Sequence, residues 1–231
     1  MTLLYHTPLH AGSRMVRLVL AEYDVPFQLV DEALWQRREE FLAINPAATL
    51  PVLVDDEATI IGAGPIGEYC DETRGALARE ERLFPDTPVA RAEMRRMCDW
   101  ALLKLENEVT RYLVTERVTK RQMPSDAGGG APDSQALRAA RANMRYHLAY
   151  LSWIAATRSW IAGERMSQAD LAVAGALSVL DYLGEVDWEN TDAAPLRDWY
   201  ARMKSRPAFR PLLADHLRGI APVSHYADLD F

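Results

Sequence analysis

The sequence predicts an α/β domain at residues 1–76 and an all-helical domain at residues 89–218. Three observations support this division. Every strand-like run of apolar and β-branched residues lies before residue 62. A charged segment with two prolines follows at residues 77–88 and is predicted to be a linker. Beyond it, apolar residues recur at the three-to-four spacing of amphipathic helices. Residues 219–231 then form an acidic and aromatic tail.

The first domain is predicted to run strand, helix, strand, hairpin, helix. Residues 2–5 form a short apolar strand, and "SRMVRLVLAEYDV" is a helix with apolar residues on one face and arginines opposite. "PFQLVDEAL" gives the second strand, and "TLPVLVDDEATII" gives a hairpin with an acidic turn. Pro65 then opens a helix to about Arg74, because proline suits the first helical turn. This order fits a thioredoxin-like domain.

The second domain begins with one long amphipathic pattern over residues 89–121. It ends at "MPSDAGGGAPDS", where consecutive glycines and two prolines disfavour regular structure. A helix is predicted at about residues 135–156. In "SQADLAVAGALSVLDYL", Ser167 stands three residues before Asp170, which predicts a capped and nearly all-apolar buried helix. "APLRDWYARMKSRPAFRPLL" predicts two short helices divided at Pro207.

Composition excludes several classes of function. The chain has 231 residues and a formal net charge of −7, whereas a non-specific nucleic-acid binder needs a basic face. No apolar run is long enough for a signal peptide or a membrane span, so a cytoplasmic protein without membrane insertion is expected. Cys70 and Cys98 lie in helical segments and are expected to be buried free thiols. The five histidines lack metal-ligand spacing, so no metal site is predicted.

Several local patterns together resemble the glutathione S-transferase superfamily. "NPAATLPVLVDD" is similar to its NPxGxVPVLxD run, in which the proline, here Pro51, is expected to be cis. "GERMSQADLAVAG" is similar to its S-x-x-D capping motif, and "LRDWYARMKSRPAF" to its C-terminal helices. The match covers residues 2–215. It implies a thioredoxin-like domain, a helical domain and a homodimer formed through the helices flanking the linker.

The stretch "TIIGAGPIGEY" departs from that superfamily at its ligand site. In members that bind glutathione, an acidic residue and a serine at this helix start hold the ligand's ammonium and carboxylate groups. Here those positions are Gly62 and Ala63, and Pro65 lacks an N–H group. Two lost charge-assisted contacts of about 1.5–3 kcal/mol each predict binding at least about a hundredfold weaker. We therefore expect no enzyme activity of this kind and no cofactor.

The first turn, "HTPLHAGSR", holds the alternatives for catalysis. His10 stands where members of the superfamily carry the serine or cysteine that activates the thiol, and Thr7 and Ser13 could supply a hydroxyl. A glutathione-dependent transferase or isomerase that uses His10 or Ser13 is therefore the alternative function. The other interpretation of His10 is a histidine on the surface, facing a partner.

Two further segments have features of recognition surfaces. "LWQRREEF" places Trp35 beside Arg37 and Arg38, and Trp and Arg are enriched at binding hot spots. The alternative is that Trp35 packs on its own domain. Arginines of the long helix, among them Arg95, are expected on a solvated or dimer-flanking face.

The C-terminal tail is the other such segment. It contains no Lys or Arg after Arg218, and its apolar side chains alternate with acidic ones. Exposed apolar groups cost free energy, so the tail either docks on its own domain or serves as a motif for a partner. The candidate partner-binding residues of the tail are His225, Tyr226, Asp228, Leu229, Asp230 and Phe231.

The missing ligand pair and the ending "HYADLDF" together resemble the FtsZ-localised, glutathione-transferase-like cell-division proteins of alphaproteobacteria. That resemblance implies a non-enzymatic cytoplasmic adaptor at the division site. It would bind filaments of the tubulin-like GTPase FtsZ, promote curved bundles and link septum constriction to septal wall synthesis through the tail. The filament-binding face near the vestigial pocket would include His10, Arg14, Trp35, Arg37 and Arg38.

Overall fold

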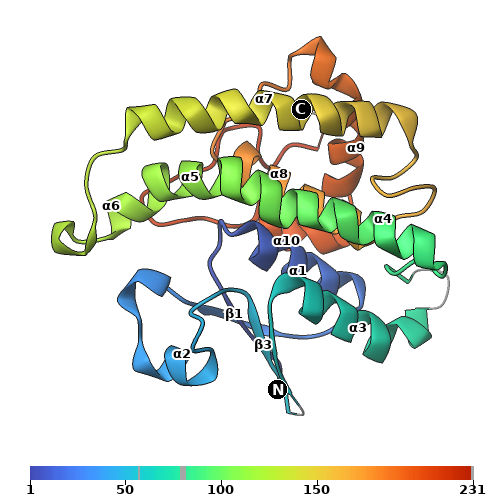
Figure 1. Ribbon diagram of the computed structural model, residues 1–231, viewed down its shortest axis with the longest axis horizontal. Helices are drawn as coiled ribbons and strands as arrows, with labels where there is room; N and C mark the ends of the chain where they lie inside the picture. The colour runs from blue at the N-terminus through green and yellow to red at the C-terminus, as the bar shows by residue number, and fades with distance from the viewer. Residues whose placement is uncertain (57, 79–81, 230–231) are drawn as a thin grey trace.

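The computed structural model describes residues 1–56, 58–78 and 82–229. It confirms the predicted fold class: a sheet with helices forms one half of the molecule and a bundle of helices forms the other (Figure 1). No helix in the described ranges has both the length and the apolar character needed to cross a membrane.

The first half is built on a four-stranded sheet of order β2-β1-β3-β4. β1 pairs parallel to β2 and antiparallel to β3, and β3 pairs antiparallel to β4, as in a thioredoxin-like domain. The strands are β1 (Leu3–His6), β2 (Gln28–Asp31), β3 (Val52–Val54) and β4 (Thr59–Ile61). The helices are α1 (Ala11–Glu22), η1 (Leu34–Gln36), α2 (Glu39–Ile44) and α3 (Ala63–Ala78). The peptide bond before Pro51 is cis, as the resemblance implies.

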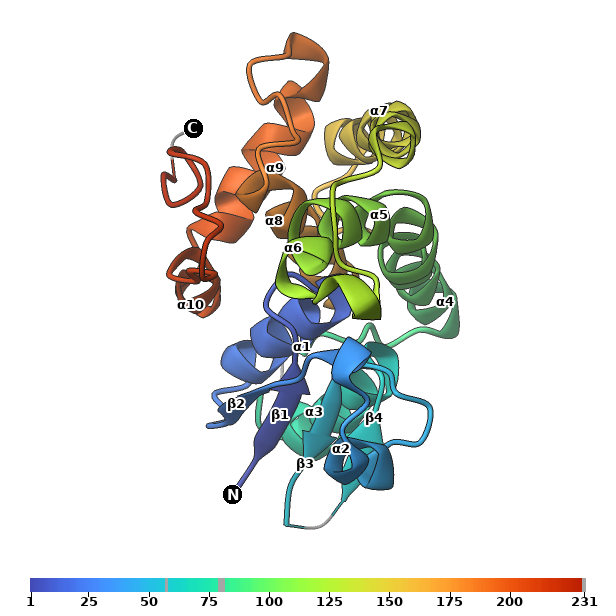
Figure 2. The ribbon, with the colours of Figure 1, turned by 90° about the vertical axis from the view of Figure 1, so that its left-hand side faces the viewer.

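Helix α1 lies between α3 and the helical domain, where it packs against α8 (Gln168–Tyr182) (Figure 2). Ten consecutive residues of α1, from Ala11 to Leu20, are buried. The prediction that its arginines lie opposite the core is therefore wrong: Arg14 is 0% exposed and Arg17 is 5% exposed. A helix covered on both sides has no solvent face, and its cations are buried with partners.

The predicted long helix of the second half runs from residue 88 to 122 and includes two stretches of π-helix. A separate long helix, α7, packs along it, and α8 and α9 complete the bundle (Figure 1). The continuous segment comprises α4 (Pro88–Asp99), η3 (Trp100–Thr110), α5 (Arg111–Val114), η4 (Thr115–Thr119) and α6 (Lys120–Gln122). The others are η5 (Ser125–Ala127), α7 (Ser134–Thr157), η6 (Thr191–Ala193), α9 (Ala194–Lys204), η7 (Pro207–Phe209) and α10 (Arg210–Leu213).

The capping box predicted at the start of α8 is present. The carboxylate of Asp170 accepts hydrogen bonds from the backbone N–H groups of Ile161 and Ser167, both at 2.9 Å, and from Trp199 Nε1 at 3.1 Å. Burial raises the pKa of Asp170 to about 6, although these donors oppose the shift. One carboxylate thus fastens the start of the buried helix to α9 and to the loop before it.

Candidate functional site

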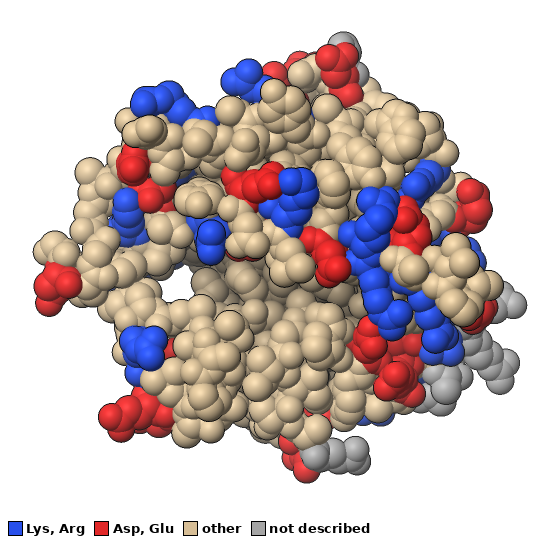
Figure 3. Space-filling view, viewed as in Figure 1, with Lys and Arg blue, Asp and Glu red and all other residues tan. Residues whose placement is uncertain are grey.

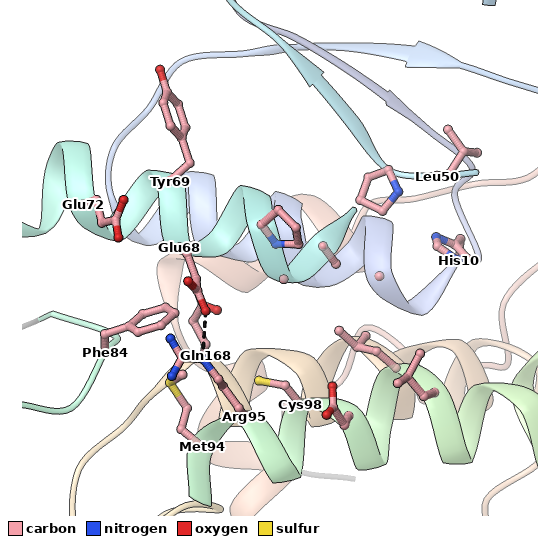
Figure 4. Close-up of a pocket in the computed structure, with 18 residues that line it drawn as sticks. His10, Leu50, Glu68, Tyr69, Glu72, Phe84, Met94, Arg95, Cys98 and Gln168 are labelled. Atoms are coloured by element: carbon pink, nitrogen blue, oxygen red, sulfur yellow. Dashed lines mark hydrogen bonds and ion pairs between the residues drawn. The ribbon is translucent and has the colours of Figure 1, made fainter. Parts of the chain in front are cut away.

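A cleft of about 710 Å³ lies between the two domains. One wall is formed by the start of α1, the Pro51 loop and the first turns of α3, and the other by α4 and η3 (Figure 4). In the space-filling view the surface is hollowed between the two halves, and basic side chains gather over α4 (Figure 3). His10, Pro51, Ala63 and Pro65, which sequence reasoning connected with the vestigial pocket, all line this cleft.

The start of α3 presents backbone groups to the cleft. Gly62 has a φ of 96°, which favours glycine, and its N–H donates to Pro51 O at 2.9 Å. The helix begins at Ala63, two residues earlier than predicted, so Pro65 is its third residue. The N–H groups of Ala63 and Gly64 precede any intrahelical acceptor, whereas Pro65 has none. The site therefore keeps two backbone donors but has no acidic or hydroxyl side chain at this helix start.

His10 is the N-cap residue of α1, and its ring lines the other end of the cleft (Figure 4). Its Nδ1 accepts from the backbone N–H of Ser13 at 3.2 Å, so the neutral ring carries its proton on Nε2. Burial lowers the pKa of His10 below its ordinary value, and Glu106 opposes this shift in part. A neutral ring of this kind can donate one hydrogen bond from Nε2.

The two hydroxyl candidates of the first turn are already engaged. Ser13 is 0% exposed and its Oγ lies 3.0 Å from His10 Nδ1. Thr7 donates its hydroxyl to the backbone oxygen of Glu32 at 2.8 Å. Of the predicted thiol-activating candidates, only His10 lines the cleft.

An ion pair joins the two walls of the cleft. Glu68 on α3 and Arg95 on α4 lie 2.9 Å apart, and the Arg95 guanidinium also stands over the Phe84 ring (Figure 4). Arg95 is the one Lys or Arg among the described residues that line the cleft, and its charge is matched by Glu68. Burial raises the pKa of Cys98 to about 12, which keeps this thiol protonated and weakly nucleophilic at neutral pH.

The predicted recognition segment around Trp35 lies in the loop between β2 and α2, outside the cleft lining. Trp35 is half-buried, and Arg37, with a φ of 48°, is exposed. Arg38 is exposed but donates from Nε to the buried Glu32 carboxylate at 3.1 Å. The loop therefore presents one aromatic and two cationic side chains. It is anchored to the sheet domain by the contact between Arg38 and the buried Glu32 carboxylate.

Arg14 was predicted to belong to the partner-binding face, and the structure contradicts this. Among the described residues it is the largest fully buried side chain. Its guanidinium donates to Pro8 O at 2.6 Å, to Ser178 Oγ and Tyr226 Oη at 2.8 Å each, and to Asp215 at 3.3 Å. A cation with this many buried partners has no group left to offer a filament.

The tail is divided at Tyr226, which was predicted to contact a partner but is 0% exposed. Its hydroxyl accepts from Arg14 and donates to Leu212 O at 3.0 Å, while the half-buried His225 places Nε2 3.1 Å from Asp181. Figure 2 shows the tail folded back beside α9 and α10. Asp228 and Leu229 are exposed, and Asp230 and Phe231 lie outside the described residues. The tail thus docks through residues 225–226, and residues 227–229 point outward.

Sequence reasoning missed the acidic groups that hold the tail and Arg14, namely Asp181 and Asp215. Asp181 is 0% exposed and also accepts from Trp188 Nε1 and Tyr200 Oη. A single carboxylate within the apolar run "SVLDYL" is a signal that a buried polar network lies at that helix end.

Comparisons with known proteins place this geometry in a family. A family model described as glutathione S-transferase, N-terminal domain, matches residues 12–73, and the model for the C-terminal domain matches residues 123–207. FtsZ-localized protein A of Caulobacter vibrioides is 43% identical over 232 residues, covering 99% of this chain and 97% of that protein.

Solved structures match the whole chain, and two of them illustrate the range of names. A glutathione S-transferase from Sinorhizobium meliloti has a TM-score of 0.97 and 55% identity, covering 100% of each chain. FzlA from C. crescentus has a TM-score of 0.91 and 42% identity, covering 100% of this chain and 99% of that one. Both resemblances seen in the sequence are confirmed, and the chain belongs to the glutathione S-transferase superfamily.

Proposed function

We propose that this protein is a non-enzymatic adaptor that binds FtsZ filaments at the division site. The observation that carries the proposal is the 43% identity to FtsZ-localized protein A over 99% of the chain. An alignment of that extent leaves out only about 1% of the residues, so it includes the C-terminal tail as well as both domains. The tail is a distinguishing feature, because it lies beyond residue 207, where the family match ends.

The chemistry of the cleft supports an adaptor over a transferase. A glutathione molecule carries an ammonium and two carboxylates, and the start of α3 offers it backbone N–H groups only. Arg95, which could pair with a carboxylate, is matched by Glu68 at 2.9 Å. Each missing charge-assisted contact costs about 1.5–3 kcal/mol of binding. We instead assign filament recognition to the loop at residues 32–38, called the Trp35 loop, and to the end of the cleft that His10 lines, called the cleft mouth.

A homodimer would give the adaptor two filament sites. Exposed apolar side chains lie on α7 and η3: Tyr146 is 79% exposed, Trp153 57% and Leu103 56%. Ile61 on the edge strand β4 is 38% exposed. We assign the exposed apolar residues of α7 and η3, two helices that pack against each other, to the contact with a second copy of the chain, since monomeric proteins seldom expose large apolar patches. Two weak sites would then bridge protofilaments by avidity, and their relative angle would favour a bent filament.

Filament binding is tested by co-pelleting with GTP-assembled FtsZ at micromolar concentrations. The wild type is expected in the pellet, and Trp35→Ala is expected to weaken binding by about tenfold or more, as for a hot-spot tryptophan. Trp160→Ala is the matched control, because Trp160 is also half-buried but lies in the helical domain against Arg202. Absence of the wild type from the pellet would overturn the proposal. Equal binding by the two variants would show that the Trp35 loop is not part of the filament-binding surface.

The outward end of the tail is proposed to link filaments to septal wall synthesis. Deleting residues 228–231 removes the exposed Asp228 and Leu229 with the two residues after them, and keeps the buried Tyr226. The melting temperature and FtsZ binding should stay near wild-type values, whereas constriction should fail in cells that carry only the truncated protein. A large drop in melting temperature would show that this segment is structural. Normal constriction would contradict the assigned role.

A second candidate function is a glutathione-dependent transferase or isomerase. The observation in its favour is His10 at the cleft, whose Nε2–H could donate to a thiolate, as could be expected of a relative of the S. meliloti glutathione S-transferase. Retention on immobilised glutathione and turnover of an electrophilic aryl halide, both lost in His10→Ala, would support it. We expect neither retention nor turnover.

A further inference from the structure

One of the contacts that hold the tail joins its buried tyrosine, Tyr226, to a buried cation. Tyr226 Oη accepts from Arg14 Nη1 at 2.8 Å and donates to Leu212 O at 3.0 Å. Both Tyr226 and Arg14 are 0% exposed. If the tail left this position, one N–H of the buried Arg14 guanidinium would lose its hydrogen-bond partner, which is costly for a buried charge. The position of Arg14 is therefore tied to the docked tail.

Arg14 also holds the first turn of the α/β domain. Its Nε donates to Pro8 O at 2.6 Å, inside the turn that His10 N closes by donating to Thr7 O at 3.1 Å. This turn carries the His10 ring into the cleft. One guanidinium thus contacts the C-terminal tail with Nη1 and the turn at the cleft mouth with Nε.

The first turn in turn holds the Trp35 loop. Thr7 Oγ1 donates to Glu32 O at 2.8 Å, and Glu32 N donates to His6 O at 2.8 Å. The Glu32 side chain is 0% exposed and accepts from Arg38 in the loop. An unbroken series of contacts therefore runs from Tyr226 through Arg14, the first turn and Glu32 to the loop that carries Trp35.

We propose that the docked tail positions the Trp35 loop through Arg14, so that the two partner surfaces are energetically coupled. Arg14 and Tyr226 are positioning residues, since neither is exposed to a partner. Undocking of the tail at Tyr226 would loosen the first turn and the loop, and a filament that binds the ordered loop would favour the docked tail by the same factor. The identity of the two partners rests on the proposed function, whereas the coupling between the tail and the loop is a property of this chain and can be measured without a partner.

The coupling is tested on the full-length protein by amide hydrogen exchange, without any partner. Tyr226→Phe removes only the hydroxyl that Arg14 contacts. Exchange is expected to be about three- to tenfold faster in residues 7–14 and 32–38, because Arg14 loses one buried hydrogen bond, and faster also in the tail, which loses its bond to Leu212 O as well. Tyr182→Phe is the matched control. It removes a buried hydroxyl that donates to Ile220 O at 2.7 Å on the same tail, but that hydroxyl does not contact Arg14.

A second variant keeps the test decisive if Tyr226→Phe does not fold. Ser178→Ala removes another partner of the Arg14 guanidinium and leaves the tail sequence intact. It should speed exchange in residues 7–14 and 32–38, as Tyr226→Phe does. Faster exchange confined to the residues around each substitution would overturn the proposal. An equal effect of Tyr182→Phe on residues 7–14 and 32–38 would also overturn it, since general loosening would then explain the result.

The functional consequence is measured separately with GTP-assembled FtsZ. Tyr226→Phe should weaken co-pelleting by about three- to tenfold relative to Tyr182→Phe, matching the change in exchange. Unchanged co-pelleting together with faster exchange in residues 32–38 would contradict the coupling of the two surfaces. If the wild type itself does not co-pellet, the proposed function fails, and the exchange pattern still decides whether the tail and the loop are coupled.

Discussion

Replacing Asp170 with alanine is expected to lower the free energy of unfolding by about 4 kcal/mol, because buried donors would lose a shared acceptor. The N–H groups of Ile161 and Ser167 and the indole of Trp199 all donate to this carboxylate, which is 0% exposed. Chemical denaturation followed by circular dichroism measures the loss.

Asp198→Ala is the control for that substitution. Asp198 also lies near the start of a helix, α9, but its side chain is 75% exposed, and its ion pair with Arg197 spans 3.6 Å. An exposed pair of this kind contributes little to stability, so the control should stay within about 0.5 kcal/mol of wild type. A loss of under about 1 kcal/mol in Asp170→Ala would show that water or a neighbouring side chain replaces the carboxylate.

Replacing Gly175 with leucine is expected to cost about 3 kcal/mol through overpacking. A Cβ atom at this position in α8 would lie 3.0 Å from Met15 N and 3.2 Å from Ala11 O, both backbone atoms of α1. Backbone cannot rotate away as a side chain can, so α1 and α8 would have to separate. Since α1 belongs to the α/β domain and α8 to the helical one, the two domains should part at this point. Denaturant unfolding measures the loss.

Gly64→Leu provides the matched control. Gly64 is also a helical glycine without a positive φ, yet a Cβ there meets nothing within 4 Å. Because leucine favours helix over glycine, stability should be unchanged or slightly higher. Equal costs at the two positions would contradict the packing argument and would indicate that leucine itself is poorly tolerated in either helix.

Local chemistry made the fold and part of the site predictable from the sequence. The capping box at Ser167 and Asp170 is specified within four residues, and the turn at Gly62 that leads into α3 is likewise local. Hydrophobic periodicity likewise predicted the long helices to within a residue or two at most ends. In these cases the residues that determine the structure are neighbours in the chain.

Arg14 and Tyr226 could not be placed in the same way. Arginine is usually exposed, so Arg14 was predicted to lie on the surface, whereas the composition of the tail left open whether Tyr226 docks on its own domain or contacts a partner. Their burial depends on each other and on Asp215, which is 201 residues from Arg14 in the sequence. The starting residue of α3 escaped prediction for a smaller reason: proline suits several positions of a first helical turn.

The buried contact between Arg14 and Tyr226 also has a consequence for the order of events during synthesis. The two residues are separated by 212 positions, so at about 5–20 residues per second Arg14 leads Tyr226 by about 10–40 s. Over that interval the guanidinium lacks the Tyr226 hydroxyl, although Pro8, Ser178 and Asp215 are made earlier and can already accept from it. The set of hydrogen bonds around Arg14 is therefore complete only after the segment that carries Tyr226 has been made.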